Sequence, residues 1–336
     1  QIEKGKNYSV KLRDMKKIIV FYNILRNYKK FTKKFTLRFY LFINPFYCAL
    51  CYVLIKMLLI TKSFRLINFF CEKNILQAGL RYLSQKNRQE VGENINYYYN
   101  KNLKALDTKY NDEILTKLKE DGFSKIGKIF TDQDCEDFKN ILNGADCYNS
   151  QTLIQSDGKK IKFEKNFFEE NVDYSYLYFP PNISLKMEKL NNFLKSENLV
   201  NLIQNYLHFT PIIYNLTTWV NFQSKERHYV HRVHRDYDDF KFMTLIIYWT
   251  DADKNNGVTE LIKGSHSSKK SSYDSSDLIA LNSTKGTVFL FDGSTLHKGN
   301  EKIDKYRIAT FVRFGKRENY ASVLDGGISD PLYYNS

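Results

Sequence analysis

Residues Lys285–Phe314 read KGTVFLFDGSTLHKGNEKIDKYRIATFVRF, and this stretch contains the pattern that decides the fold. Two runs rich in β-branched and aromatic residues, Gly286–Phe291 and Arg307–Phe314, flank a polar segment that begins with a turn signal at Asp292-Gly293. Short runs of this composition, bounded by turn residues, are typical of strands. Because no helical pattern separates the two runs, the stretch predicts strands of an antiparallel sheet.

Three similar runs precede this stretch, at Pro211–Phe222, Phe242–Thr250 and Val258–Ile262. Turn signals at Asn255-Asn256-Gly257 and Lys263-Gly264-Ser265 separate them further. Several short strands at this spacing, without intervening helices, indicate an antiparallel sandwich or barrel. The second half of the chain is therefore expected to be a β-rich domain.

The segment that precedes this β-rich half has a different pattern. Residues from about 74 to 120 are polar and helical in pattern, and Gly122 introduces an alternating run, Phe123–Phe130, that is typical of an edge strand. Thr131 is a plausible N-cap for a helix through Cys135–Leu142. We expect a strand and a helix to flank the β-rich domain here.

Most of the net charge lies at one end of the chain. The 336 residues carry a formal charge of +14, and residues 1–38 contain twelve Lys or Arg against two acidic residues. This basic arm, residues 1–38, is followed at once by an apolar block, which suits an anionic membrane surface better than nucleic acid. Nucleic acid is therefore an unlikely partner. Met15 also looks like a plausible start of the natural chain.

The apolar block spans residues 39–60 and has no charged side chain before Lys56. Its length is at the lower limit for a membrane span of about 20 residues, and Asn44 and Pro45 count against one. Three interpretations stay open: a short spanning helix, an amphipathic helix on an anionic membrane, or a buried helix. No small-residue cleavage site follows, so the block does not resemble a signal peptide. Membrane contact through residues 1–70 is a prediction to be tested.

The cysteine content favours a reducing compartment. Five cysteines in a chain of this length are too few, and odd in number, for a disulfide framework, so we expect a cytoplasmic protein with possible membrane association. Cys48 and Cys51 form a CxxC, but they lie in the apolar block without a second ligand pair. We interpret them as small buried apolar residues.

The side chains that indicate chemistry form an HxD triplet and a distant histidine. His234 and Asp236 precede the strand expected near Phe242, and in extended backbone two residues at i and i+2 point to the same side. His297 follows the expected strand Gly286–Phe291, which can lie beside the HxD segment in a rolled sandwich. Two histidines and one carboxylate leave metal positions open, as iron(II) oxygenases require for cosubstrate and dioxygen.

Arg307 stands ten residues after His297, at the head of the next expected strand. A guanidinium matches the fork geometry of a carboxylate, such as the distal carboxylate of 2-oxoglutarate. The combination of HxD, a histidine about 60 residues later and an arginine ten residues beyond it predicts an Fe(II)- and 2-oxoglutarate-dependent site that uses O2. His228, His231 and His266 are more plausibly surface or structural residues, although His231 could face the substrate.

Three segments resemble the phytanoyl-CoA dioxygenase family of Fe(II)/2-oxoglutarate-dependent oxygenases. They are LKEDGFSKIGKIFTDQDCEDFKNIL (Leu118–Leu142), LIIYWTDADKNNGVTELIKGSH (Leu245–His266) and the opening stretch Lys285–Phe314. The resemblance covers about 200 residues, roughly Leu115–Gly315, and leaves the first 95 residues outside it. One departure is Lys263, where proline is usual, which concerns the rigidity of a turn.

The resemblance implies an α+β fold with a double-stranded β-helix (jelly-roll, cupin-like) core, flanking helices and an N-terminal helical extension. We expect the extension at 1–95, the dioxygenase domain at 96–320 and a tail at 321–336. In the family pattern, His234, Asp236 and His297 would hold iron, Arg307 would hold 2-oxoglutarate and Trp249 would lie beside the cosubstrate. Halogenating relatives replace the carboxylate by a small residue, so Asp236 favours hydroxylation.

The substrate is the least determined part of the prediction. The family acts on fatty acyl thioesters, small metabolites, antibiotics and sugar derivatives. Specificity is expected to come from three segments, Lys159–Asn182, Arg227–Arg232 and Ser265–Asp277, several of which are basic and hint at an anionic small molecule or acyl thioester. The alternative is a catalytically inactive, membrane-associated binding protein on the same scaffold.

Overall fold

The computed structural model describes residues 51–60, 87, 92, 112–148, 160–161, 168, 175–223, 229–236, 238–267 and 273–315. The chain divides into two compact units, residues 1–101 and 102–336. In the first unit, residues 51–60 are helical and expose Val53, Met57 and Ile60. Within the described ranges, no helix has both the length and the apolar character needed to cross a membrane. The basic arm, the start of the apolar block and the tail at 321–336 lie outside the described residues.

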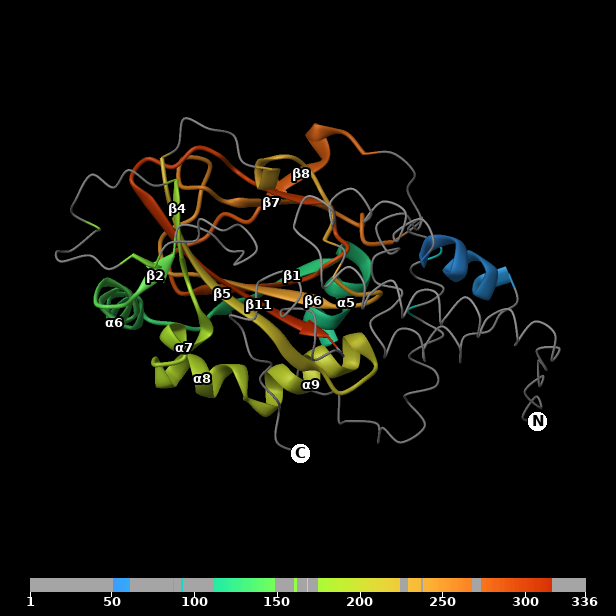
Figure 1. Cartoon of the computed structure of the whole chain (residues 1–336), viewed down its shortest axis with the longest axis horizontal. Helices are drawn as coiled ribbons and strands as arrows, with labels where there is room; N and C mark the ends of the chain where they lie inside the picture. Colours follow the sequence, from blue (N-terminus) through green and yellow to red (C-terminus); the bar gives the residue numbers. More distant parts are fainter. Residues whose placement is uncertain are drawn as a thin grey trace, which may run out of the picture. The chain divides into compact units, whose positions relative to one another are not determined.

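The second unit contains two antiparallel sheets that face each other (Figure 1). In order across the large sheet, the strands are β1 (Phe123–Lys128), β9 (Thr287–Asp292), β6 (Met243–Tyr248), β11 (Tyr306–Gly315), β5 (Ile212–Phe222), β4 (Tyr176–Phe179), β2 (Cys147–Tyr148) and β3 (Lys160–Ile161). The small sheet is β10 (His297–Gly299), β7 (Thr259–Ile262) and β8 (Leu278–Ala280). The expected α+β class with a jelly-roll core is confirmed.

Helices cover the face of the large sheet that is turned away from the small one (Figure 1). They are α5 (Asp112–Asp121), α6 (Asp132–Asn143), α7 (Pro181–Ser184), α8 (Glu188–Leu194) and α9 (Glu197–Leu207). Helix α6 begins as the sequence predicts, because Thr131 and Asp134 form a reciprocal capping box. Strand β1 pairs only with β9 and lies at the sheet edge, which confirms the expected edge strand.

Strand alternation divides the large sheet into two faces with separate cores. Leu245, Ile247 and Val312 belong to the core beneath the helices. The intervening residues Ile246 and Tyr248 belong to a second core, between the sheets. Because side chains alternate along a strand, the odd-numbered residues of β11 and the even-numbered residues of β6 share the inner face. This inner face supplies most of the pocket described below.

The HxD segment extends the small sheet at its β10 edge. His234 forms an antiparallel bridge with His297, and the backbone N–H of each residue donates to the carbonyl oxygen of the other at 2.9 Å. On its other side, His297 pairs with Leu261 of β7. Backbone pairing therefore holds together two segments that are 63 residues apart in sequence.

Candidate metal centre

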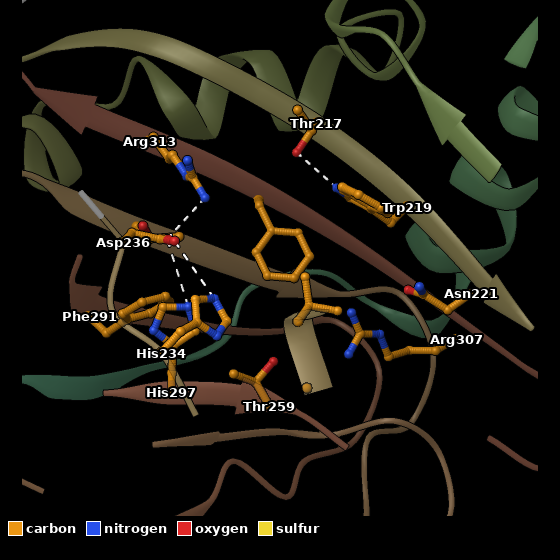
Figure 2. A pocket seen from close by; sticks show the side chains of 14 residues that line it. Thr217, Trp219, Asn221, His234, Asp236, Thr259, Phe291, His297, Arg307 and Arg313 are labelled. Carbon is orange, nitrogen blue, oxygen red and sulfur yellow. Dashed lines mark hydrogen bonds and ion pairs between the residues drawn. The ribbon is translucent and has the colours of Figure 1, made fainter. Parts of the chain in front are cut away.

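The structure brings His234, Asp236 and His297 together. Nε2 of His234 lies 3.8 Å from Oδ1 of Asp236, and Nε2 of His297 lies 3.7 Å from Oδ2 of the same carboxylate. One potential ligand atom from each residue falls within 4.8 Å of the other two, a spacing that a single metal ion can bridge. Figure 2 shows the three side chains converging at one end of a pocket.

Hydrogen bonds on the far side of each imidazole orient the two histidines. Nδ1 of His234 lies 2.8 Å from the carbonyl oxygen of Arg232, and Nδ1 of His297 lies 2.9 Å from that of Thr295. Since a carbonyl can only accept, Nδ1 of each ring is the donor in these contacts, and Nε2 is the nitrogen that faces the carboxylate of Asp236. This is the arrangement by which proteins fix the tautomer of a metal-binding histidine.

The environment of His297 keeps its imidazole neutral at neutral pH. Burial lowers the pKa of His297 below its ordinary value, and the neighbouring His234 adds to this lowering, while the carboxylate of Asp236 opposes it. A neutral imidazole is the form that binds a metal ion. His297 is only 9% exposed, so the site is shielded from bulk water on this side.

Arg235, the middle residue of the HxD triplet, points away from the pocket and anchors the segment. Its Nη1 donates to the carbonyl oxygens of both Ser265 and Ser294. These carbonyls belong to two different turns, so the guanidinium ties the HxD segment to both. The HxD ligands are thus held by backbone pairing on one side and by Arg235 on the other.

Arg307 lines the same pocket at the end opposite the triad (Figure 2). It is 7% exposed, its Nη1 donates to the carbonyl oxygen of Gly257, and its Nε is buried without a hydrogen-bond partner. Burial lowers the pKa of this guanidinium, whose charge still persists because its ordinary pKa is above 12. A buried cation with a free donor requires an anionic or polar partner from within the pocket.

Two further buried polar atoms in the pocket also have no partner. They are Oδ1 of Asn221, which lies opposite Arg307 in the β5–β11 register, and Oγ1 of Thr244 on β6. Buried polar atoms are normally hydrogen-bonded, so such atoms around one cavity indicate a polar ligand. The cavity has a volume of about 120 Å³ and is also lined by Trp219 and Phe311.

A second arginine lies beside the triad. Arg313 on β11 donates from Nη2 to Oδ2 of Asp236 at 3.0 Å and from Nη1 to Oδ2 of Asp238. Asp238 also accepts a hydrogen bond from the buried Tyr214 hydroxyl at 3.0 Å. Burial raises the pKa of Asp238, and the charge of Asp236 adds to this increase, whereas Arg313 opposes it.

The family model for phytanoyl-CoA dioxygenase (PhyH) matches residues 118–307, which is more than half of the chain. The chain belongs to the phytanoyl-CoA dioxygenase family. The matched region includes the HxD triplet, His297 and Arg307, whereas Arg313 lies beyond its end. A search of curated proteins returns no match to this sequence.

Solved structures with a similar fold share little sequence with this phytanoyl-CoA dioxygenase family member. The non-heme alpha-ketoglutarate-dependent epimerase SnoN from nogalamycin biosynthesis is 12% identical, with a TM-score of 0.46, over 68% of this chain and 94% of SnoN. EctD from S. alaskensis, solved with 2-oxoglutarate and 5-hydroxyectoine, is 14% identical, with a TM-score of 0.44, over 65% of this chain and 80% of EctD. HygX from Streptomyces hygroscopicus, solved with nickel and 2-oxoglutarate, is 14% identical, with a TM-score of 0.43, over 63% of this chain and 87% of HygX.

Trp249, which the family resemblance placed beside the cosubstrate, lies elsewhere in this family member. It is 2% exposed, belongs to the core beneath the helices and stacks on Phe138 with ring centroids 4.0 Å apart. Its Nε1 donates to Oγ1 of Thr310 at 2.8 Å, and Thr310 also faces the helices. The tryptophan that lines the pocket is Trp219 on β5. The expected contact of Trp249 with the cosubstrate therefore has no counterpart in this geometry.

The remaining histidines that the structure describes lie outside the ligand set. His266 is buried against α5, with Nε2 3.1 Å from the carbonyl oxygen of Lys119, which agrees with the structural role expected for it. His231 ends the short 3-10 helix η3 (Tyr229–His231) and is not among the residues that line the pocket. His228 lies outside the described residues.

Proposed function

We propose that this chain is an Fe(II)- and 2-oxoglutarate-dependent dioxygenase that hydroxylates a small molecule. One observation carries the proposal: a His–Asp–His triad whose potential ligand atoms lie within 4.8 Å of one another and a buried arginine with an unpartnered donor occupy opposite ends of one pocket. The triad supplies donors for a metal ion, and the arginine supplies a charged fork for a carboxylate at a distance from that ion.

The residues present fit iron(II) and 2-oxoglutarate by their chemistry. His234, Asp236 and His297 form a two-histidine, one-carboxylate donor set that leaves other metal positions open. Arg307 is a buried cation without a carboxylate partner among the described residues, and a dicarboxylate cosubstrate would provide one. Asn221 and Thr244 offer further polar atoms to the same ligand.

In the proposed reaction, 2-oxoglutarate, dioxygen and a substrate C–H group give succinate, carbon dioxide and the hydroxylated product. Bound iron(II) would supply the activation of dioxygen and the coupling of the two oxidations. Arg307 would hold the distal carboxylate and thereby fix the orientation of the cosubstrate. Trp219 and Phe311 line the pocket and limit the access of water to it.

Turnover of 2-oxoglutarate by the full-length protein tests this proposal. The iron-loaded protein is assayed for succinate formation with each member of a panel of small molecules that includes anionic metabolites and acyl thioesters. The substrate is expected to increase the rate of succinate formation above the rate measured without it. His234→Ala and Asp236→Ala should both abolish succinate formation. His208→Asn is a matched control, because His208 ends α9 far from the pocket and asparagine tolerates its positive φ. Succinate formation that survives both ligand substitutions would overturn the proposal.

The alternative function, an inactive binding protein on the same scaffold, makes a different prediction. A scaffold without catalytic function has no reason to retain four converging groups, and their intact geometry favours the enzyme. Titration of the protein with iron(II) and then with 2-oxoglutarate separates the two functions, because an inactive scaffold should bind neither tightly.

We also propose that residues 1–70 bring the enzyme to an anionic membrane surface. The support is the basic arm, residues 1–38, together with the apolar residues that follow it. Flotation with vesicles that contain phosphatidylserine should recover the full-length protein. Replacement of the lysines in the basic arm by glutamine should abolish recovery, and unchanged recovery of that variant would contradict membrane attachment through charge.

A further inference from the structure

Arg313 and Arg307 lie six residues apart on β11 and face the same pocket, but their partners differ. Arg313 already donates to two carboxylates, one on Asp236 and one on Asp238. Arg307 donates to a single backbone carbonyl and keeps Nε unpartnered. Arg313 is thus paired with carboxylates of the protein, whereas Arg307 has no carboxylate partner among the described residues.

The contacts of Arg313 fix where the carboxylate of Asp236 can be. The guanidinium is planar and rigid, so two carboxylates bound to its two Nη atoms have a defined separation. Asp238 is the fixed side of this arrangement, because it also accepts from the hydroxyl of Tyr214, which is 1% exposed on β5. Asp236 is the side that faces the two histidines (Figure 2).

The carboxylate of Asp236 lies between Arg313 and the two histidines. Oδ2 accepts from Arg313 at 3.0 Å and lies 3.7 Å from Nε2 of His297, and Oδ1 lies 3.8 Å from Nε2 of His234. A guanidinium that holds one oxygen of a carboxylate limits the rotation of that carboxylate, so Arg313 fixes how Asp236 faces the two histidines.

We propose that Arg313, held in place by Asp238, is a positioning residue that orients the carboxylate of Asp236 toward a metal ion bound by the two histidines. This inference rests on the proposed function, because it assumes that the triad binds a metal ion. Asp238 has a second effect, since its negative charge balances that of Arg313 beside a divalent cation. The two residues extend the HxD triplet to a longer unit, His234-Arg235-Asp236-Tyr237-Asp238, completed by an arginine from the neighbouring strand.

Cobalt(II) binding to the full-length protein tests this role independently of turnover. The dissociation constant and the visible absorption spectrum of bound cobalt(II) are measured for the wild type and for Arg313→Met, Arg313→Lys and the double variant Arg313→Met/Asp238→Asn. We expect Arg313→Met to weaken binding by about 10- to 100-fold, as loss of a group that orients a ligand does, and to change the spectrum. Arg313→Lys should recover part of the affinity, because it keeps a charge and a donor.

The double variant separates positioning from stability. Arg313→Met alone leaves Asp238 buried without its cation, so the melting temperature of the metal-free protein should fall. Removal of the charge in the double variant should restore much of that melting temperature while cobalt(II) binding stays weak. Lys298→Met is a matched control, because Lys298 follows His297 but pairs with Glu260 rather than with Asp236. The cobalt(II) affinity of this variant should equal that of the wild type.

Two results would overturn the inference. One is wild-type affinity and spectrum in Arg313→Met, and the other is a double variant that regains cobalt(II) affinity together with stability. Failure of the wild type itself to bind cobalt(II) or iron(II) would be a different result, because it would overturn the proposed function and not the positioning role alone.

Discussion

Arg307 and Gly257 are joined by a hydrogen bond from Nη1 of the arginine to the carbonyl oxygen of the glycine. Gly257 has a φ of +66°, a value that residues with a side chain rarely adopt. A Cβ added at this position would lie 3.0 Å from Cγ1 of Ile303 and 3.2 Å from Cδ of Arg307. The turn at Gly257 therefore forms one wall against which the arginine is held.

Gly257→Ala should weaken 2-oxoglutarate binding as well as stability. The positive φ costs about 1–2 kcal/mol for alanine, and the added methyl group pushes against the arginine. We expect a several-fold increase in the dissociation constant for 2-oxoglutarate, measured by calorimetry on the metal-loaded protein. Gly264→Ala is the matched control, because its φ is +71° and its nearest contact would be 3.6 Å away. The control should lose stability alone, and equal affinities in the two variants would contradict the role of Gly257.

Substitution of Arg307 tests the cosubstrate site directly. Arg307→Lys keeps the charge but loses the fork, and Arg307→Gln loses both. A charge-assisted hydrogen bond contributes about 1.5–3 kcal/mol, so the KM for 2-oxoglutarate should rise by about 10- to 100-fold. The larger effect is expected in the glutamine variant. A KM within twofold of the wild type in both variants would show that the cosubstrate carboxylate binds elsewhere.

The sequence was sufficient to predict the strands and the convergence of His234, Asp236 and His297, because both depend on local patterns. Each of the five β-rich runs became a strand, and the alternation of extended backbone placed His234 and Asp236 on one side. His297 could be assigned by its position after a strand. These inferences needed no knowledge of which strands are neighbours.

Arg313 and Asp238 were missed because their roles depend on strand neighbours. Arg307 and Arg313 are six residues apart, so the sequence alone could have placed them on the same face of a strand. The carboxylate partners of Arg313 come from a segment about 75 residues earlier, and only the tertiary fold brings that segment against β11. A charged residue that alternates with apolar ones in a central strand is the signal that could have singled out Arg313.

Trp249 shows a different limit. The strand that leads to it, β6, is buried at every residue, so hydrophobic alternation cannot tell its two faces apart. The structure distinguishes them, because Tyr248 faces the small sheet while Trp249 packs under the helices. The cosubstrate role was carried over from the family, and the strand geometry of this chain does not support it.

Metal binding should stabilise the folded protein. A ligand that binds only the native state adds about 2.7 kcal/mol when its concentration is 100 times the dissociation constant. Addition of manganese(II) under anaerobic conditions should therefore raise the melting temperature, and EDTA should reverse the increase. His297→Ala should abolish the shift, because it removes one of three ligands. His266→Gln is the control, and loss of the shift in that variant would place the metal elsewhere.

Trp249→Phe should lower stability without changing 2-oxoglutarate affinity. The substitution removes the hydrogen bond to Thr310 and part of the stacking on Phe138, at a cost of about 1–3 kcal/mol in the free energy of unfolding. Urea denaturation measures this cost. Trp219→Phe changes a pocket residue on β5 and should affect cosubstrate or substrate binding more than it affects the free energy of unfolding. An increased KM for 2-oxoglutarate in Trp249→Phe would restore the cosubstrate role.

Cys135 is expected to be unreactive in the folded protein. It is 2% exposed on α6, and burial raises the pKa of its thiol to about 11. At pH 8 only about one thiol in a thousand would then be ionised, and the thiolate is the reactive form. Brief treatment of native protein with iodoacetamide at pH 8, followed by peptide mass spectrometry, should leave Cys135 unlabelled, whereas protein in urea should be labelled.

The raised pKa of the Cys135 thiol also predicts how the free energy of unfolding changes at high pH. The folded pKa of Cys135 is higher than the ordinary value of 9.0, so the unfolded state loses its proton first. The stabilising contribution of the protonated thiol is therefore fully present below pH 9 and is lost as the pH rises through about 11. Cys135→Ala lacks this titration, so the free energy of unfolding of the wild type should fall more steeply than that of the variant across this range. Parallel curves for the two proteins, or rapid labelling of native Cys135, would show that the thiol is accessible to water.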